Sequence, residues 1–133
     1  MTEQNIDPIV VSPIVPNENI TFDDFKKIKM AIGKIISAEK VPETDKLLRL
    51  NVDFNEKNEA GESKPRQVVS GISTHFPDPE LLVGNKYVFV INLEPRVIKG
   101  FESQAMILAA STDDSVFSLI SPSNDIPQGV VLK

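Results

Sequence analysis

The strongest constraint on the fold is an alternation of apolar and polar side chains between residues 48 and 54. Every second residue there is apolar, and charged or amide side chains lie between. This period of two predicts a β-strand with one face in the core and the other in water. The apolar positions are Leu48, Leu50, Val52 and Phe54.

Several other short segments have the composition of strands and are separated by turn residues. The run at 87–91 is apolar throughout, as expected of a strand buried on both faces. Gly33 lies inside another segment, where a glycine marks a bulge or a sharp bend. The predicted strands are 30–41, 67–72, 87–91, 105–110 and 116–120, and residues 130–132 close the chain as a β extension.

A short helix is predicted at the start of the domain. Thr21 and Asp24 have the spacing of a capping box. Apolar side chains follow at the spacing of one helix face. They are Phe22, Phe25 and Ile28.

A second helix is predicted between the third and fourth strands. Asp78 suits the N-cap, Pro79 suits the first helical position, and Gly84 ends the segment. Short strands at regular spacing with a helix at this point indicate a small closed barrel. The predicted fold is therefore all-β: an OB-fold barrel with a short N-terminal helix, a helix between strands 3 and 4, and a C-terminal β extension.

The length of 133 residues allows one compact domain and is too short for two. Pro8, Pro13 and Pro16 exclude a helix or a central strand near the N-terminus. We therefore predict a linker or loosely docked tail at 1–19 and the folded domain at 20–133.

Few residues could support catalysis. The chain has no cysteine, which excludes disulfides and thiolate metal sites, and His75 is its only histidine. His75 follows Ser70 and Ser73 closely, but no nucleophile-elbow motif surrounds them, so a structural role for His75 is favoured. We expect a binding module without catalytic residues, metal or cofactor.

The net charge of −5 disfavours a nucleic-acid partner, which usually needs a basic surface. The first 20 residues hold three of the acidic residues and no Lys or Arg, so the rest of the chain carries only −2. A local basic stripe is compatible with that charge. No apolar run approaches the roughly 20 residues that span a bilayer, and a signal peptide is not evident, so a cytoplasmic protein without a membrane partner is expected.

Two polar stretches differ from ordinary surface. Residues 92–104 carry cations behind a proline after the buried strand, and residues 45–49 begin the amphipathic strand with a cation. Strand faces and adjoining loops of an OB barrel form its usual oligonucleotide surface. The residues alone leave open a solvated rim with ordinary surface charges. The candidate RNA-binding residues are Lys46, Arg49, Arg66, Ser70, Asn92, Arg96, Lys99, Ser103 and Gln104.

The loop after residue 91 gives the most specific hypothesis. If it forms a hairpin rim, Arg96 and Lys99 face a groove beside Ser70 and Ser103. Glu94 then partly offsets their positive potential. Lys57, in the polar loop 55–64, serves as an example of an ordinary surface charge.

An ordered series of blocks over residues 20–133 resembles the tRNA-binding domain family. This family includes the C-terminal extension of methionyl-tRNA synthetases, free-standing structure-specific tRNA-binding proteins, and eukaryotic synthetase cofactors such as the precursor of endothelial monocyte-activating polypeptide. The resemblance implies an OB barrel that recognises the outer corner of tRNA by shape. It also implies a homodimer formed through the N-terminal helix and the C-terminal extension. The matching blocks include 20–25, 32–35, 45–50, 66–72, 82–84, 92–96, 100–110 and 127–129.

Departures from the family pattern predict weak binding. Residues 30–33 read Met-Ala-Ile-Gly where the family usually has Leu-Arg-Val-Gly, and Glu94 replaces a usual Lys or Ala. Weak binding is useful when a domain is tethered to a catalytic domain. We therefore favour the C-terminal domain or β subunit of methionyl-tRNA synthetase, with tRNA and a synthetase catalytic domain as partners.

Proteins of related sequence or fold suggest two other functions. A small bacterial export chaperone of related fold binds unfolded polypeptide, but the blocks at 45–48 and 69–72 fit the tRNA-binding branch better. Secreted cytokine activity, as in fragments of the eukaryotic cofactors, has no support from a signal peptide.

Overall fold

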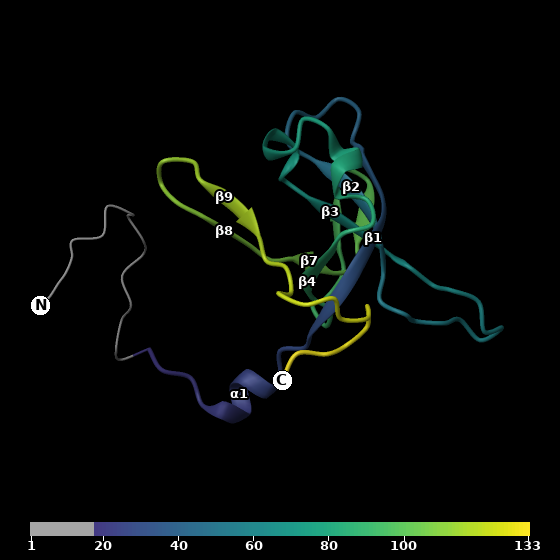
Figure 1. Cartoon of the computed structure of the whole chain (residues 1–133), viewed down its shortest axis with the longest axis vertical. Coiled ribbons are helices and arrows are strands. Elements are labelled where there is room, and N and C mark those ends of the chain that lie inside the picture. Colours follow the sequence, from purple (N-terminus) through teal and green to yellow (C-terminus); the bar gives the residue numbers. More distant parts are fainter. Residues whose placement is uncertain (1–17) are drawn as a thin grey trace, which may run out of the picture.

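A long strand organises the sheet, because its two halves pair with different neighbours. The computed structural model describes residues 18–133, and in it β1 (Met30–Lys40) pairs antiparallel with β4 (Lys86–Val90) and then with β2 (Leu48–Asp53). β3 (Arg66–Ser70) and β7 (Met106–Ile107) complete a sheet of order β3-β2-β1-β4-β7, which curves into a barrel (Figure 1). The OB-like β fold predicted from the sequence is therefore confirmed.

The core is built from the inward faces of these strands. The predicted alternation is confirmed in β2, where Leu48, Leu50 and Val52 are fully buried. Val88, Phe89 and Val90 of β4 are buried in succession, as the continuous apolar run predicted. Phe89 packs edge to face against Phe54, with ring centroids 5.2 Å apart.

Gly33 is required by side-chain packing inside the barrel. A Cβ atom at this position would lie 2.5 Å from Val52 and 2.6 Å from Phe54, closer than carbon atoms pack. The register of β1 also shifts, but between Ile35 and Ser37. The irregularity that Gly33 predicted therefore lies slightly further along the strand.

The predicted strand at 105–110 is divided in the structure. Its first part is β7 and its second is β8 (Ala109–Ser111), which forms a hairpin with β9 (Phe117–Leu119). This hairpin extends away from the barrel (Figure 1). The sequence pattern did not reveal the division, because both parts are apolar.

The first predicted helix forms as α1 (Phe22–Lys26), and the hydroxyl of Thr21 accepts a hydrogen bond from the Asp24 amide at 3.1 Å. The second is replaced by two short 3₁₀ turns, η2 (Ser73–His75) and η3 (Pro79–Leu82). Asp78 makes no side-chain capping bond there. The backbone is extended at Val83, and the Gly84 amide donates to the carbonyl of Ile35 in β1 at 2.8 Å, so the segment ends after a single 3₁₀ turn and a regular helix does not form.

The C-terminal extension covers the free edge of the first half of β1. The amide of Ile32 donates to the carbonyl of Val130, and the amide of Gly129 donates to the carbonyl of Ile32. Val131 also forms a bridge with Ala31. No helix within residues 18–133 is long and apolar enough to cross a membrane. Residues 1–17, most of the predicted linker, lie outside the described residues.

A seam of side-chain hydrogen bonds joins β3 to residues 103–105. Ser103 Oγ accepts from the Val69 amide at 3.0 Å and donates to the Ala105 carbonyl at 3.1 Å. The side-chain oxygen of Gln104, Oε1, accepts from the backbone amide of Gln67 at 2.9 Å. The backbone amide of Gln104 donates to the backbone carbonyl of Gln67 at 2.8 Å. These contacts satisfy backbone groups that an unpaired strand edge would leave open. We call this arrangement the β3 seam.

The β3 seam predicts that Ser103→Ala lowers stability. The change leaves the Val69 amide without its buried acceptor, which costs about 1–3 kcal/mol of unfolding free energy. Urea unfolding followed by circular dichroism measures the loss. Ser111→Ala, at an exposed position of β8, is the control. Equal stability of the two variants would show that the seam does not hold the barrel.

Candidate functional site

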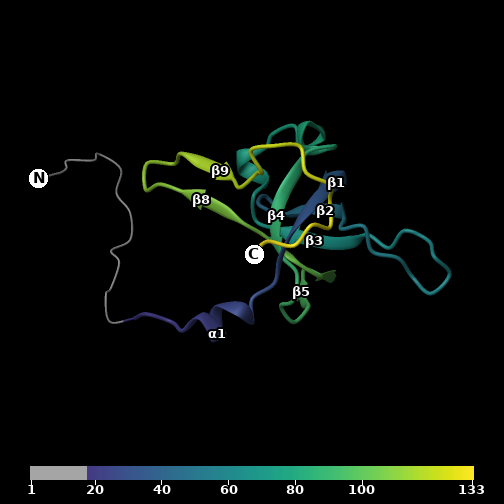
Figure 2. The same cartoon turned by 60° about the horizontal axis from the view of Figure 1, so that its bottom comes forward.

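The loop predicted to carry cations forms a tight hairpin. β5 (Arg96–Ile98) pairs with β6 (Phe101–Ser103), and the two residues between them are Lys99 and Gly100. Both have positive φ angles, 51° and 86°, as a type I′ turn requires. Lys99 is therefore exposed at the tip of the hairpin, which projects from one side of the barrel (Figure 2).

Arg96 lines a small recess at the base of this hairpin. The recess has a volume of about 70 Å³ and is also lined by Ser70, Glu94 and Ser103, over a floor that includes Ile98. Arg96 therefore lies beside the two serines, and Glu94 shares the recess, as the sequence hypothesis expects. Lys99 does not line the recess, since it lies at the tip.

The outer face of β1, β2 and β3 carries a second polar recess of about 240 Å³. Arg49 lines it and pairs with Glu39 across the strands. The Arg49 guanidinium also lies 5.0 Å from the centre of the Phe101 ring, so β2 contacts the β5–β6 hairpin here. Asn51 and Gln67 supply further polar groups. Lys46 is exposed in the loop before β2.

Arg66 is held by the fold on several sides. Its Nε and Nη2 donate to the Glu56 carboxylate, each at 2.8 Å. Its Nη1 donates to the carbonyls of Ile91 at 2.6 Å and Gln104 at 3.1 Å. The side chain therefore fastens the base of the 55–65 loop to the segment after β4. The predicted RNA contact at Arg66 stays a prediction, with its donors already engaged.

Three predicted polar contacts also have partners within the fold. Asn92 accepts from the Lys29 amide at 2.8 Å and donates to the Lys27 carbonyl at 2.6 Å, which ties α1 to the end of β4. Ser103 is buried, and it belongs with Gln104 to the β3 seam. Among the nine predicted site residues, Lys46, Arg96 and Lys99 are the exposed cations that form no ion pair within residues 18–133.

Sequence reasoning overlooked Lys57 and Lys64 as site residues. Both lie in the loop before β3, whose sequence at 55–64 predicts only an exposed loop. In the structure they line a groove together with Leu93 and Pro95, next to Arg96. Lys57 therefore cannot serve as the example of a surface charge far from Arg96 in a comparison of variants. A polar loop does not indicate in its sequence which side of a barrel it faces.

His75 lies against an aromatic side chain of β9. His75 stacks on Phe117, with ring centroids 3.9 Å apart and planes 5° apart, which supports its structural role. Residues 18–133 contain no group of three side chains that could hold a metal ion.

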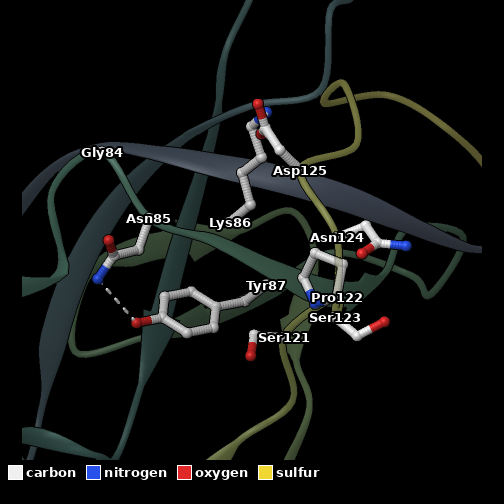
Figure 3. A pocket seen from close by; sticks show the side chains of 9 residues that line it. All are labelled: Gly84, Asn85, Lys86, Tyr87, Ser121, Pro122, Ser123, Asn124 and Asp125. Atoms are coloured by element: carbon white, nitrogen blue, oxygen red, sulfur yellow. Dashed lines mark hydrogen bonds and ion pairs between the residues drawn. The ribbon is translucent and has the colours of Figure 1, made fainter.

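A cavity of about 470 Å³ lies between residues 84–87 and 121–125 (Figure 3). Its polar side chains bond to one another: Lys86 donates to Asp125 at 2.9 Å, and Asn85 donates to the Tyr87 hydroxyl at 3.1 Å. The Lys86 ammonium, through this hydrogen bond and its charge, holds the pKa of the Asp125 carboxyl below its usual value. The contact of Lys86 with Asp125 attaches the C-terminal segment to β4.

The sequence of residues 30–131 identifies the family to which the protein belongs. The model of the family described as "Putative tRNA binding domain" matches residues 30–131, so the chain belongs to this tRNA-binding domain family.

The chain is similar to part of methionine–tRNA ligases. It is 46% identical to the ligase of Methanococcus aeolicus over 112 residues, which are 84% of this chain and 15% of the ligase. It is 40% identical to that of Porphyromonas gingivalis over 116 residues, 87% of this chain and 16% of the ligase. The chain therefore spans about 16% of the length of these relatives.

Two solved structures share the fold over nearly their whole length. A MetRS related protein from Pyrococcus horikoshii is 38% identical with a TM-score of 0.76, covering 87% of this chain and 99% of that one. The chaperone CsaA from Bacillus anthracis is 28% identical with a TM-score of 0.70, covering 86% and 99%.

Proposed function

We propose that this chain is a non-catalytic tRNA-binding module that serves a methionyl-tRNA synthetase, as a domain or as a separate subunit. The membership of the family and the identity to methionine–tRNA ligases support this function. The observation that carries it is the position of Arg96 and Lys99 on a tight hairpin beside the β2–β3 face, the usual oligonucleotide surface of an OB barrel. As a partner of a synthetase the module acts in the cytoplasm.

The chemistry of this surface favours recognition by shape. Lys46, Arg96 and Lys99 offer cations for phosphates, and phosphate contacts carry no sequence information. Phe101 is partly covered by Arg49, so little aromatic surface is available there to stack on unpaired bases. Glu94 reduces the positive potential, which predicts an affinity that is useful mainly when the module is tethered to the enzyme.

An alternative is the binding of unfolded polypeptide, as suggested by the structural similarity to the chaperone CsaA. The apolar floor of the Arg96 recess favours it, because side chains such as Ile98 and Met106 could contact an apolar residue. The recess has a volume of only about 70 Å³, which is small for a large side chain.

A titration with three ligands separates these functions. We expect folded tRNA to bind with micromolar-scale affinity, with little dependence on anticodon and a steep loss of affinity in salt, since phosphate contacts dominate. Unstructured RNA of the same length and a reduced, unfolded polypeptide should bind more weakly. Equal affinity for the two RNAs would exclude recognition by shape. Preference for the polypeptide would favour the alternative.

Variants of the hairpin test the site itself. Arg96→Ala and Lys99→Ala should each weaken tRNA binding and flatten its dependence on salt by about one unit, as expected from the loss of one phosphate contact. Glu94→Lys should strengthen binding and steepen the dependence. Binding isotherms at several salt concentrations measure both quantities.

A lysine outside the hairpin and its recesses is the control. Lys34 lies in β1 opposite Lys86 of β4, and it lines neither the Arg96 recess nor the groove that contains Lys57. Lys34→Ala should change affinity and slope only slightly. If it matched Arg96→Ala in both, the hairpin would not be the binding site.

We also propose that the module is a homodimer. Phe22 and Ile28 of the N-terminal segment are 72% and 46% exposed, and Val131 is 50% exposed. They line a largely apolar cavity of about 380 Å³ between α1 and the last residues. Exposed apolar patches rimmed by charged residues mark association surfaces. A helix that only covers the end of the barrel is the alternative.

Sedimentation at micromolar concentrations tests the dimer. The chain should sediment as a dimer, and Phe22→Ser should shift it toward monomer, because the change removes an apolar contact from the interface. Leu81→Ser is the control, since Leu81 is 73% exposed on η3, outside this cavity. A monomer at all concentrations would mean that α1 is only a lid.

A further inference from the structure

A second cationic surface lies beside the hairpin, on the 55–65 loop. A groove of about 340 Å³ separates this loop from the segment that follows β4. Lys57 and Lys64 line one side, and Leu93 and Pro95 line the other. Both lysines are exposed, and neither forms an ion pair with another residue in the described part of the chain. The groove therefore combines two available cations with an apolar wall.

The acidic residues of the loop do not cancel these cations at the groove. Glu56 lines the groove, but both of its oxygens accept hydrogen bonds from Arg66, so the pair is neutral. Glu59 and Glu62 do not line the groove, and Glu62 accepts a hydrogen bond from Asn58. Glu94 lines the neighbouring Arg96 recess rather than this groove, so Lys57 and Lys64 are the uncompensated charges among the residues that line the groove.

The two lysines are held in position by the backbone of the loop. The amide of Lys64 donates to the carbonyl of Glu56 at 2.9 Å, and Lys57 forms a bridge with Ser63. Arg66 then fastens the base of the loop to the carbonyl of Ile91. Figure 2 shows the loop projecting beyond the ends of β2 and β3. A fixed loop loses less conformational freedom when it binds a ligand.

The groove is continuous with the surface already described. Leu93 is 50% exposed and lines both this groove and the Arg96 recess, so the two hollows adjoin at this side chain. A polyanion that contacts Arg96 reaches Lys57 and Lys64 by crossing Leu93 and Pro95. The two surfaces together form one cationic path along the 91–96 segment.

We propose that this groove binds the sugar-phosphate backbone of folded RNA, with Lys57 and Lys64 contacting phosphates and Leu93 packing against a ribose or base edge. The proposal rests on the tRNA-binding function and extends it to a second contact that the sequence did not indicate. Two cations beside an apolar wall suit a phosphodiester chain, which alternates charged groups with less polar sugars. An acidic polypeptide is the competing ligand.

Salt-dependent binding of folded tRNA tests the groove. Lys57→Ala and Lys64→Ala should each weaken binding several-fold and flatten the salt dependence by about one unit, and the double variant by about two units. Leu93→Ser should weaken binding without changing the salt dependence, because it removes an apolar contact and no charge. Lys34→Ala and Leu81→Ser are the matched controls. Urea unfolding of each variant verifies that the substitutions, including the one at the half-buried Lys34, leave the fold intact.

The outcomes separate this proposal from the function on which it rests. If the unaltered chain does not bind folded tRNA, both proposals are wrong. If it binds and Arg96→Ala weakens binding, while the double lysine variant behaves like Lys34→Ala, only the groove proposal is wrong. If the double variant loses binding of a glutamate-rich peptide but keeps its affinity for tRNA, the groove receives an acidic polypeptide and the proposal is overturned.

Discussion

Closure of the barrel depends on side chains rather than on a regular ladder between its end strands. β3 is the last strand of the sheet, and its amides at Gln67 and Val69 face residues 103–105. Ser103 and Gln104 supply the acceptors, and unsatisfied amides at this edge would each cost free energy comparable to a lost hydrogen bond. The hairpin that carries Arg96 and Lys99 begins and ends beside this seam. The geometry of the cationic surface therefore depends on the same contacts that close the core.

The fold also determines which cations remain available to a ligand. Arg66 bonds to a carboxylate and two backbone carbonyls, and Lys86 bonds to Asp125 and the Ile126 carbonyl, so both stabilise the fold. Lys57, Lys64, Arg96 and Lys99, by contrast, lie on two neighbouring loops. An acidic chain can in this way present a positive surface, because ion pairs neutralise some of its cations while other cations lie grouped and unpaired on one surface.

The sequence predicted the elements of the fold better than the roles of its polar residues. The alternation at Leu48 and Val52 is a local property that reports burial directly, so the strand was predicted correctly. The helix at Asp78 was predicted from favourable end residues, but the segment ends at Val83, where the chain turns to bond with Ile35 of β1 through Gly84. Local patterns therefore predicted the strands with regular burial, and they missed an element whose end depends on a contact distant in sequence.

The sequence did not indicate the hydrogen-bond partners of the polar residues. Ser103 bonds with Val69 from 34 residues away, and Asn92 bonds with Lys27 from 65 residues away. A hydroxyl or amide that closes a barrel has the same local sequence as one that awaits a ligand. Lys57 and Lys64 could not be placed for the same reason, since the folding of the 55–65 loop toward Pro95 depends on Arg66.

The backbone pairing of the last residues with β1 has a consequence for the behaviour of the protein outside its functional state. Gly129, Val130 and Leu132 occupy the hydrogen-bonding edge of β1 opposite β4. Removal of these residues by a protease would uncover the backbone groups of Met30 and Ile32 along a strand that is otherwise intact. Such an edge is a template for strand addition by another molecule. Trimming at this end would therefore leave an unpaired strand edge that favours aggregation, while every residue of the cationic surface would stay in place.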